Sequence, residues 1–486
     1  MNYKTDILII GAGISGCSLA RELSRFKADV AVIDRGNDLA EGATKANSGI
    51  VHAGYDAKPG SNKARLNVAG AQMFPALCER LGVPYRRVGA LVIALNGQDR
   101  AVLEELLERG LKNGVQHLSI LSREEALAME PRLNPELVAA LSVPTSGIVS
   151  PYELAFAMAD DAAINGVRFF LNREAAEVCR AEDGFRVTAG PDVFECRVLV
   201  NCAGASAAAI HNGLTGDSLE MIHRRGQYYL LDHAASDVFS RTIFQCPSAM
   251  GKGVLVSPTV HGNLLIGPTA EDIPDPLDTA TTQEGLDNIL LTAKKTWPEL
   301  NVRANITNFS GVRAHLAADD FLVGPVTGCP GAFEAVGIES PGLSSAPAIG
   351  RELAGQIADY LALERKSRLN DYPVPPKPFR EMTDEEKAEA CRRNPEYGSV
   401  ICRCEVVTEA EVRGAIRRPV GARTIDGVKR RTRAGMGRCQ GGFCLPRVAA
   451  ILAEELHCDL SDIRKDGSDS FLVTGPLADP EERKTV

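Results

Sequence analysis

The sequence of 486 residues predicts an α/β fold with a second, sheet-rich region and a separate small domain toward its C-terminal end. Three observations lead to this prediction. A strand, a glycine-rich turn, a helix and a second strand follow one another in residues 6–34. Apolar residues alternate along 224–266, and four cysteines form two pairs beyond residue 400. Because the chain is too long for a single hydrophobic core, we expect several domains.

The first region carries the fingerprint of a dinucleotide-binding βαβ unit. Gly11 would make the tight turn, Gly13 would let the backbone approach a pyrophosphate, and Gly16 would let helix and strand pack closely. The pyrophosphate would then lie at a helix N-terminus, where free N–H groups favour negative charge. Asp34 lies 18 positions after Gly16, close to the spacing expected for an acid that accepts ribose hydroxyls. A tight turn without a ligand is the alternative, but strand, glycines, helix, strand and acid in this order argue against it.

Composition limits the classes of protein to which the chain can belong. A net charge of −9 and a pI near 5.6 argue against nucleic acid as the main partner. No apolar run approaches the roughly 18 residues of a membrane span, and the first predicted strand begins too early to leave room for a signal peptide. We therefore expect a cytoplasmic protein that does not span a membrane.

A polar, glycine-rich segment follows Asp34 and is expected to contact a flat ligand. Its small residues allow close approach of the backbone, and the candidates for cofactor contact are Thr44, Asn47, Ser48 and Gly49. His52 is the titratable ring of the segment and the candidate catalytic residue, although a lone histidine can equally be structural.

The remaining pattern predicts elements that return to the first sheet. Helices are expected over 66–81, 100–113, 152–165 and 349–363. Strands are expected over 167–171, 174–180, 185–189 and 333–338, and a buried strand that begins at Val198 ends in a glycine turn at Gly204. The alternation in 224–266 predicts an antiparallel sheet, which we interpret as a substrate domain. A strand end and a helix start near Gly342 and Leu343 offer a second place where backbone N–H groups can meet an anion.

Two phosphate-binding turns and a late return to the first sheet are what bound FAD would require. The motifs GAGISG, NSGIVHAG, NCAG, GVRA and GIESPG, in this order, resemble those of the flavin-dependent oxidases and dehydrogenases of the D-amino-acid-oxidase and glycerol-3-phosphate-dehydrogenase group. The resemblance covers about residues 5–365. It implies hydride transfer from a substrate C–H to the flavin, in a Rossmann-like FAD-binding domain interleaved with a β-sheet substrate domain. The expected division is an FAD-binding domain (1–80, 151–210, 311–365), a substrate domain (81–150, 211–310), a linker (366–396) and a C-terminal domain (397–486).

The C-terminal domain holds the four paired cysteines. Cys402 and Cys404 form a C-x-C pair and Cys439 and Cys444 a C-x4-C pair, so a metal site is the leading interpretation. Zinc fits this combination of pairs poorly and is the alternative, with unliganded thiols a third reading. The arrangement resembles the [2Fe–2S] module of bacterioferritin-associated ferredoxins, which is also appended to the large subunit of anaerobic glycerol-3-phosphate dehydrogenases. This resemblance implies a small helical domain with a [2Fe–2S] cluster on the four thiolates.

Basic residues crowd between the two cysteine pairs. Nine arginine and lysine side chains from Arg413 to Arg438 stand against Asp426 alone after Glu411. A solvated helix face is one explanation. We favour arginines that offset the negative charge of an oxidised cluster and offer a docking face to a redox partner. A flavin and a one-electron cluster on one chain indicate a dehydrogenase that feeds a partner, either a second flavin or iron–sulfur subunit or a quinone-linked one.

The expected substrate is a small anionic alcohol. In the family that the motifs resemble, an arginine at the position of Arg313 meets the anionic or hydroxyl end of the substrate, and His52 would take the hydroxyl proton. If glycerol 3-phosphate is the substrate, a further arginine is expected just after the His52 segment to bind its phosphate, but this chain has Tyr55 and Asp56 there. Another cation would have to bind the phosphate instead: Lys58, Lys63, Arg65 or Lys252. Glycerol 3-phosphate is the preferred substrate. L-2-hydroxyglutarate or another 2-hydroxy acid is the close alternative, and an amine or amino acid a distant one. From another class, the chain could be a non-catalytic electron-transfer subunit with its flavin as a relay.

Overall fold

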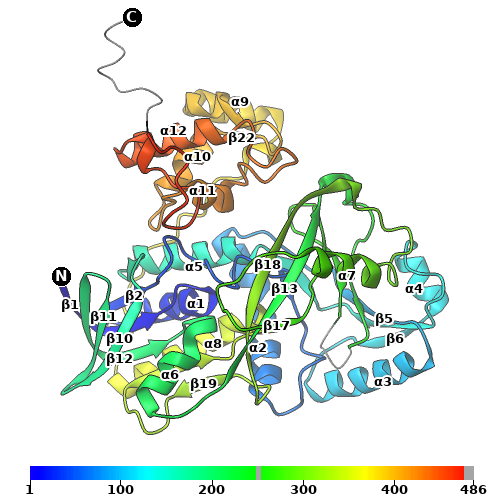
Figure 1. The fold of residues 1–486 in the computed structure, drawn as a ribbon, viewed down its shortest axis with the longest axis horizontal. Coiled ribbons are helices and arrows are strands. Elements are labelled where there is room, and N and C mark those ends of the chain that lie inside the picture. Colours follow the sequence, from blue (N-terminus) through cyan, green and yellow to red (C-terminus); the bar gives the residue numbers. More distant parts are fainter. Residues whose placement is uncertain (248–252, 476–486) are drawn as a thin grey trace, which may run out of the picture. The chain divides into compact units, whose positions relative to one another are not determined.

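The computed structural model describes residues 1–247 and 253–475, and the chain divides into two units. The first unit contains Met1–Arg35 and Leu39–Val374. The second contains Pro375–Val486 together with the tripeptide Gly36–Asp38. Each unit has its own helices, strands and apolar core (Figure 1).

The first unit is built on a mixed sheet that begins with the βαβ unit predicted from the glycines. β1 (Asn2–Ile10) lies between β2 (Val30–Ile33) and β12 (Asp192–Asn201), parallel to both, with Ile7 opposite Val30 on one side and Val198 on the other. All four residues of β2 are buried, as expected of a parallel strand covered on both faces. The sheet is completed by β9 (Arg168–Phe170), β10 (Ala175–Ala181), β11 (Gly184–Ala189), β19 (Leu322–Pro325) and β20 (Ala332–Val336).

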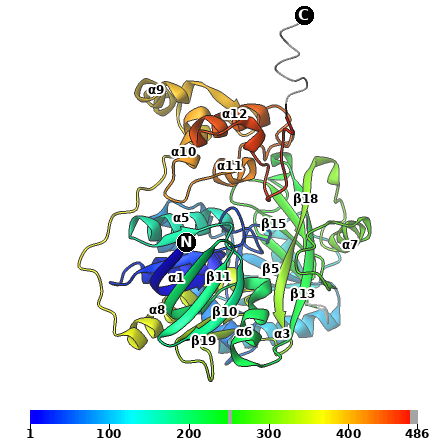
Figure 2. The same ribbon diagram turned by 60° about the vertical axis from the view of Figure 1, so that its left-hand side comes forward.

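Four of the helices in this unit pack together. α1 (Ile14–Leu23) lies beside α8 (Gly342–Leu361), as two views show (Figures 1 and 2), and also packs on α5 (Pro151–Ile164). α2 (Asn62–Leu81) packs on the other side of α8, with its Gly70 so close to Ser344 that a Cβ there would lie 2.1 Å from the Ser344 carbonyl oxygen. The start of α8 is therefore fixed against two neighbouring helices.

A second, nine-stranded sheet forms the other part of the first unit. Its longest pair is β13 (Met221–Leu231) and β18 (Asn305–Leu316), antiparallel over their whole length. The other strands are β5 (Ala90–Ala94), β6 (Ser119–Ser122), β7 (Ala139–Val143), β14 (Thr242–Gln245), β15 (Leu255–Pro258), β16 (Leu264–Gly267) and β17 (Glu271–Ile273). α3 (Gly97–Lys112), α4 (Arg123–Met129) and α7 (Gln283–Ala293) pack against it. The sheet thus joins two stretches of chain that are about a hundred residues apart, as an interleaved substrate domain requires.

Three differences from the predicted elements have local causes. The helix expected from residue 349 begins at Gly342, because the Ser345 N–H already donates to the Pro341 carbonyl at 3.1 Å, and Pro347, its sixth residue, is held inside the helix. The helix expected from residue 66 begins at Asn62, since the side chain of Ser61 accepts a hydrogen bond from the Ala64 N–H and caps it. β18 continues past the boundary expected at residue 311, because its last six residues still pair with β13.

The smaller elements of the first unit connect the two sheets. β3 (Ile50–Val51), β4 (Tyr85–Arg86) and β8 (Gly147–Val149) form a three-stranded sheet, and α6 (Ala207–Thr215) follows β12. β3 carries the chain directly to His52. The residues of the polar, glycine-rich segment are thereby held between the two larger sheets.

The second unit is helical, as predicted. It contains α9 (Asp384–Arg393), α10 (Glu409–Ile416), α11 (Ile425–Thr432) and α12 (Leu445–Leu456), with a two-stranded sheet of β21 (Val400–Cys402) and β22 (Val407–Thr408). α10, α11 and α12 pack on one another, and their apolar side chains form a single core that includes Cys402 and Cys444.

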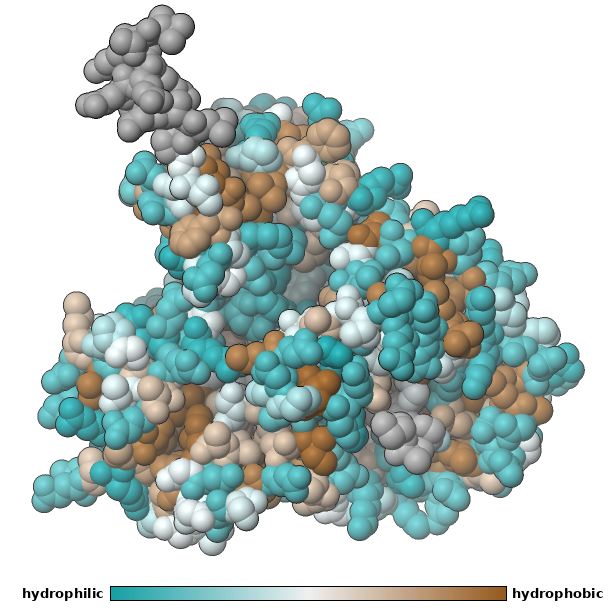
Figure 3. All heavy atoms as spheres, in the orientation of Figure 1, coloured by the Kyte–Doolittle hydropathy of each residue, from teal (hydrophilic) through white to brown (hydrophobic). Residues whose placement is uncertain are grey.

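No helix within 1–247 or 253–475 combines the length and the apolar character needed to cross a bilayer. On the face in Figure 3, hydrophilic and hydrophobic side chains are interspersed.

Candidate functional site

The glycine-rich turn tolerates no side chain at two of its three glycines. Gly11 has φ +108, and a Cβ there would lie 2.3 Å from the Cys202 carbonyl oxygen. A Cβ on Gly16 would lie 1.9 Å from the Gly11 carbonyl oxygen. The roles predicted for these glycines, a tight turn and close packing of helix on strand, are therefore the roles that the backbone requires.

Gly13, by contrast, faces open space. A Cβ there would meet a single atom within 4 Å, the Thr44 hydroxyl oxygen at 3.3 Å. The same hydroxyl accepts a hydrogen bond from the Ile14 N–H (3.0 Å), so Thr44 lies at the N-terminus of α1. The surface above Gly13 is thus left open by the protein itself, as an approaching pyrophosphate requires.

Asp34 is fixed at the same turn. Its Oδ2 accepts a hydrogen bond from the Ala12 N–H at 2.6 Å, and the residue is half-buried at the end of β2. A carboxylate held there can accept hydrogen bonds from ribose hydroxyls of a nucleotide whose phosphates lie over Gly13.

The segment that follows folds on its own side chains. Asn47 accepts a hydrogen bond from the Gly49 N–H at 2.8 Å and donates to the carbonyls of Ala43 and Thr44 at 3.0 and 2.9 Å. Gly49 has φ +65, and a Cβ there would lie 2.7 Å from the Val149 carbonyl oxygen. Asn47 and Gly49 therefore shape the loop, whereas Thr44 and Ser48 present hydroxyl groups from it.

The start of α8 meets the His52 strand. The His52 backbone N–H donates to the Ser344 Oγ at 2.8 Å. The His52 ring is half-buried and lies 5.7 Å from the Phe244 ring, centroid to centroid. Gly342 and Leu343 are the first two residues of α8, so the N–H groups predicted to face an anion do stand at a helix N-terminus.

These features fit FAD. Among the described residues, no other atom lies within 4 Å of where a Cβ would stand on Gly42 or Gly204, and on Gly13 the Thr44 hydroxyl oxygen lies 3.3 Å from that place. Asp34 supplies a fixed acceptor. The N-termini of α1 and α8 supply the positive ends of two helix dipoles, while the Ile14 N–H donates to Thr44 and the Gly342 N–H to the Glu339 carbonyl. The FAD-binding residues stay a prediction: Gly11, Gly13, Gly16, Asp34, Thr44, Asn47, Ser48, Gly49, Gly204, Gly342 and Leu343.

Arg313 lies where the cofactor loop and the second sheet meet. Its guanidinium donates to the carbonyls of Thr269 (2.5 Å), Arg224 (3.4 Å) and Arg225 (3.5 Å). The Tyr228 hydroxyl lies 3.3 Å from the Ser48 Oγ. Burial raises the pKa of Tyr228, and the nearby charge of Arg313 opposes that rise. One polar group is therefore formed by Ser48, Tyr228 and Arg313. Sequence reasoning missed Tyr228, because in the sequence it looked like an ordinary strand residue.

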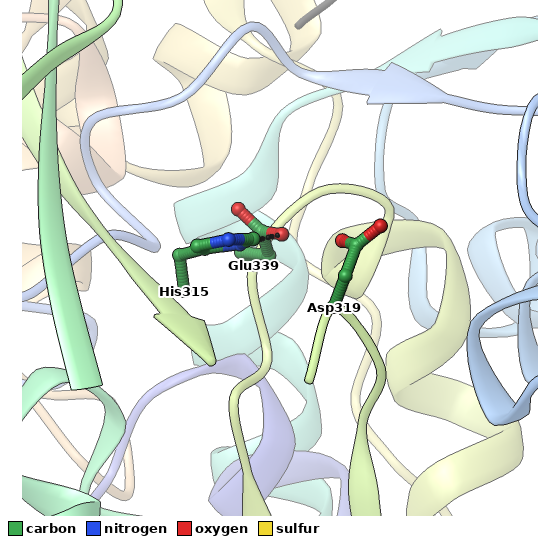
Figure 4. Close-up of side chains that lie close together, drawn as sticks. All are labelled: His315, Asp319 and Glu339. Atoms are coloured by element: carbon green, nitrogen blue, oxygen red, sulfur yellow. Dashed lines mark hydrogen bonds and ion pairs between the residues drawn. The ribbon is translucent and has the colours of Figure 1, made fainter. Parts of the chain in front are cut away.

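A cluster of His315, Asp319 and Glu339 has the composition of a metal site (Figure 4), but Lys63 already supplies a cation to its carboxylates. The Lys63 ammonium lies 2.6 Å from Asp319 and 2.8 Å from Glu339, while the His315 Nδ1 is 2.7 Å from the same Glu339 oxygen. Burial would lower the pKa of Lys63, but the Glu339 charge and the hydrogen bonds to both carboxylates outweigh it and raise the pKa. The network holds the turn before α8 and needs no metal ion.

This network and a second ion pair engage two of the four cations expected to substitute for a phosphate-binding arginine. Lys63 is engaged with two carboxylates, and the Arg65 guanidinium pairs with Glu352. Lys58 is exposed. Lys252 lies outside the described residues. Arg313 is therefore the predicted anion-binding side chain that still faces the Ser48–Tyr228 group.

The four paired cysteines of the second unit lie as two pairs of neighbours. The Cys404 and Cys439 sulfurs are 3.6 Å apart. A hydrogen bond from Cys444 lowers the pKa of Cys402 to about 6, helped by N–H groups of Gly435, Glu405 and Cys404. Two pairs of neighbouring sulfurs, with backbone N–H groups directed at them, fit a thiolate-ligated cluster.

A sulfur on the second loop is surrounded in the same way. Burial opposes ionisation of Cys439, yet a hydrogen bond from Cys404 and the N–H groups of Phe443, Gly441 and Gly442 lower its pKa. Loop geometry makes this possible, because Gly441 has φ +88 and a Cβ on Gly437 would lie 2.4 Å from the Cys404 Cβ. The glycines beside the second cysteine pair therefore bring the two ligand loops together.

The basic run between the cysteine pairs is largely neutralised within its own unit. Arg413 contacts Glu396, Glu409, Glu454 and Glu455, at 2.6–3.3 Å. Other pairs are Arg417–Glu455, Lys429–Asp426, Arg430–Asp466, Arg431–Asp38 and Arg433–Glu405. Most of these charges hold the unit together, so the expectation that the whole run forms a docking face is wrong for them.

Comparison with known proteins agrees with both units. Residues 6–356 match the model of the FAD dependent oxidoreductase family, and residues 400–454 match a BFD-like [2Fe–2S] binding domain. The chain is 47% identical to a glycerol 3-phosphate dehydrogenase of Caloramator mitchellensis, over 97% of this chain and 98% of the relative. It is 26% identical to the mitochondrial L-2-hydroxyglutarate dehydrogenase of Arabidopsis thaliana, over 73% of this chain and 83% of that protein.

A solved structure shows the same fold. The dithionite-reduced L-α-glycerophosphate oxidase of Mycoplasma pneumoniae, with FAD bound, superposes with a TM-score of 0.72 at 31% identity, over 77% of this chain and 99% of the oxidase. The chain therefore belongs to the FAD-dependent oxidoreductase family, and its cofactors are FAD and a [2Fe–2S] cluster.

Proposed function

We propose that the protein is a glycerol-3-phosphate dehydrogenase that passes electrons from its substrate through the C-terminal cluster to a redox partner. The observation that carries the proposal is the 47% identity to a glycerol 3-phosphate dehydrogenase over 97% of the chain. The paired cysteines of the second unit support electron transfer to a partner rather than to oxygen.

When bound, FAD supplies a two-electron acceptor for the substrate hydride, and the cluster supplies a one-electron carrier. The side chains near the second sheet would orient the substrate. Arg313 would bind its anionic end with the guanidinium edge that is not used for backbone carbonyls, and the Tyr228 hydroxyl would donate to the same group. A ring nitrogen of His52 would accept the hydroxyl proton as the C–H bond breaks.

The turn that leads into α8 would keep these groups in place. Glu339 is fixed by Lys63 and His315, and Ser344 holds the backbone of His52. Since proton transfer depends on positions within a few tenths of an ångström, this support is part of the proposed site.

An anaerobic visible spectrum of the purified protein tests the substrate. Addition of glycerol 3-phosphate should bleach the flavin absorbance, whereas L-2-hydroxyglutarate at the same concentration should not. Bleaching with L-2-hydroxyglutarate alone would replace the proposed substrate by the 2-hydroxy acid. A flavin that neither compound bleaches would favour the relay hypothesis or a different substrate such as an amine.

One observation keeps the 2-hydroxy acid as the second candidate. Lys63 and Arg65 are already paired with carboxylates, so the described part of the site offers Arg313 as its main anchor for an anion. A single arginine suits a carboxylate well, and a phosphate commonly recruits more cationic donors. The Arg313→Ala variant should lose apparent affinity for whichever compound is the substrate, and unchanged affinity would remove Arg313 from the site.

A further inference from the structure

We propose that an exposed face beside the cluster ligands docks an acidic protein that accepts one electron at a time. We use the name cluster face for these exposed residues, which lie within three positions of a cysteine ligand in the sequence: Arg403, Cys404, Val406, Arg438, Phe443 and Arg447. The inference rests on the proposed function, because it identifies the kind of partner that would receive the electrons.

Phe443 is the centre of the argument. Its side chain is 85% exposed, the largest exposure among the big apolar side chains of residues 1–247 and 253–475. It lies between two cysteine ligands, Cys439 and Cys444, and its own N–H is directed at the Cys439 sulfur. An aromatic ring left in water at this position is typical of an anchor residue in a protein interface.

The ligands divide into a buried and an exposed pair. Cys402 and Cys444 are 1% and 3% exposed, whereas Cys404 is exposed and Cys439 partly so. The two loops meet where the Cys404 and Cys439 sulfurs lie 3.6 Å apart. The exposed edge of the ligand set therefore opens on the side where the loop carries Phe443.

The exposed charged side chains near the ligands are arginines. Within four residues of any ligand in the sequence they are Arg403, Arg438 and Arg447. Arg447 lies 3.8 Å from Glu409 and donates to the Ser399 hydroxyl. The carboxylate within this range, Glu405, is 3% exposed and pairs with Arg380 and Arg433. The exposed charge of the cluster face is therefore mainly positive.

Charge complementarity selects the occupant. A second copy of the chain would place arginines against arginines, and like charges across an interface disfavour association. A partner with carboxylates around its own redox centre would be attracted and oriented by the arginines, and would cover Phe443 on docking.

The electron count fixes the stoichiometry. Oxidation of one secondary alcohol to a ketone releases two electrons and two protons. The two electrons reduce two one-electron partner molecules, and the protons pass to solvent. Oxidised cytochrome b5, an acidic protein, can serve as the probe, each molecule going from Fe(III) to Fe(II). Cytochrome c, a basic protein, serves as the comparison probe, since its charge is opposite to that of cytochrome b5.

The test measures anaerobic, substrate-driven reduction of both cytochromes by the holoenzyme. The wild type should reduce cytochrome b5 with a second-order rate constant that falls as salt rises. Phe443→Ala and Arg447→Glu should each lower that constant at least tenfold, while flavin bleaching and cluster absorbance stay unchanged. Phe443→Leu should recover part of the loss. Phe471→Ala, at a 47% exposed ring in the same unit, and Arg393→Glu, on α9, are matched controls that should have no effect.

Three results would overturn the proposal. The first is an unchanged rate with cytochrome b5 in both variants. The second is faster reduction of cytochrome c than of cytochrome b5 at low salt. The third is a wild-type dimer in sedimentation that Phe443→Ala separates into monomers, since the face would then bind a second copy. If glycerol 3-phosphate fails to bleach the flavin, the enzyme can be reduced photochemically instead, and electron transfer from the reduced enzyme to the cytochromes can be measured directly. A failure of the proposed function is thereby distinguished from a failure of the docking face.

Discussion

Removal of the Asp38 carboxylate should strongly destabilise the second unit. Its side chain is 2% exposed and accepts two hydrogen bonds from Arg431, both at 2.7 Å, and one from Arg430 at 3.2 Å. The Arg431 side chain is fully buried. In the Asp38→Ala variant, Arg431 keeps its hydrogen bonds to two backbone carbonyls but loses its counter-charge. Breaking a buried ion pair in this way costs about 3–5 kcal/mol.

Hydrogen exchange measured by mass spectrometry can report that loss locally. A cost of about 3 kcal/mol or more corresponds to roughly a hundredfold or greater rise in the exchange rate of α11 amides. Peptides from β1 in the first unit should exchange as in the wild type. Asp469→Ala, at an exposed carboxylate of the same unit, should leave α11 unchanged.

A double variant distinguishes a lost counter-charge from a lost contact. Asp38→Leu combined with Arg431→Met replaces the pair by apolar side chains and should recover most of the protection, because an apolar pair avoids the desolvation cost. If α11 exchanges less than about fivefold faster in Asp38→Ala, a cost below roughly 1 kcal/mol, the charge pair is not what holds this helix.

Four further outcomes are expected. Gly13→Val should abolish FAD binding by filling the open space over the turn, and a normal flavin-to-protein ratio would contradict this. Tyr228→Phe should raise the KM for the substrate about two- to tenfold, the worth of roughly one hydrogen bond, with little change in flavin content. Hydrogen bonding from Arg417 lowers the pKa of Glu455. A carboxyl group whose pKa is lowered in the folded state stabilises the fold above its ordinary pKa of 4.5, and this stability is lost as the pH falls through the lowered pKa. The Glu455→Gln variant lacks this carboxyl group. Its acid unfolding, followed by circular dichroism, should therefore depend less on pH than that of the wild type. Cys439→Ser should remove the cluster absorbance yet leave substrate-driven flavin bleaching intact; loss of both would make the cluster structural.

The features that sequence predicted well depend on neighbours in the chain. The βαβ unit could be predicted because its strand, glycines, helix and acid lie within 29 consecutive residues, 6–34. The family and both cofactors followed from motifs of this kind and are confirmed. The close approaches at Gly11 and Gly16 agree with the roles that such spacing implies.

The features that sequence missed depend on contacts between distant residues. Tyr228 joins the site because β13 brings it to Ser48, 180 positions away. The basic run seemed to face Asp426 alone, whereas folding adds Asp38 from the N-terminal part and Glu455 from α12. No local sequence pattern predicts such partners, because an arginine exposed to solvent and an arginine paired with a distant carboxylate look alike in the sequence.

The pairing of β1 also bears on how the sheet folds. Asn2 pairs with Val193, 191 positions further along the chain, and β12 pairs in turn with β20, where Leu199 lies opposite Ala332, 133 positions further. Contacts between residues so far apart form slowly, because long loops must close before they are made. The partner of β1 that is near in sequence is β2, so we expect the closing of this sheet to limit the folding rate of the first unit.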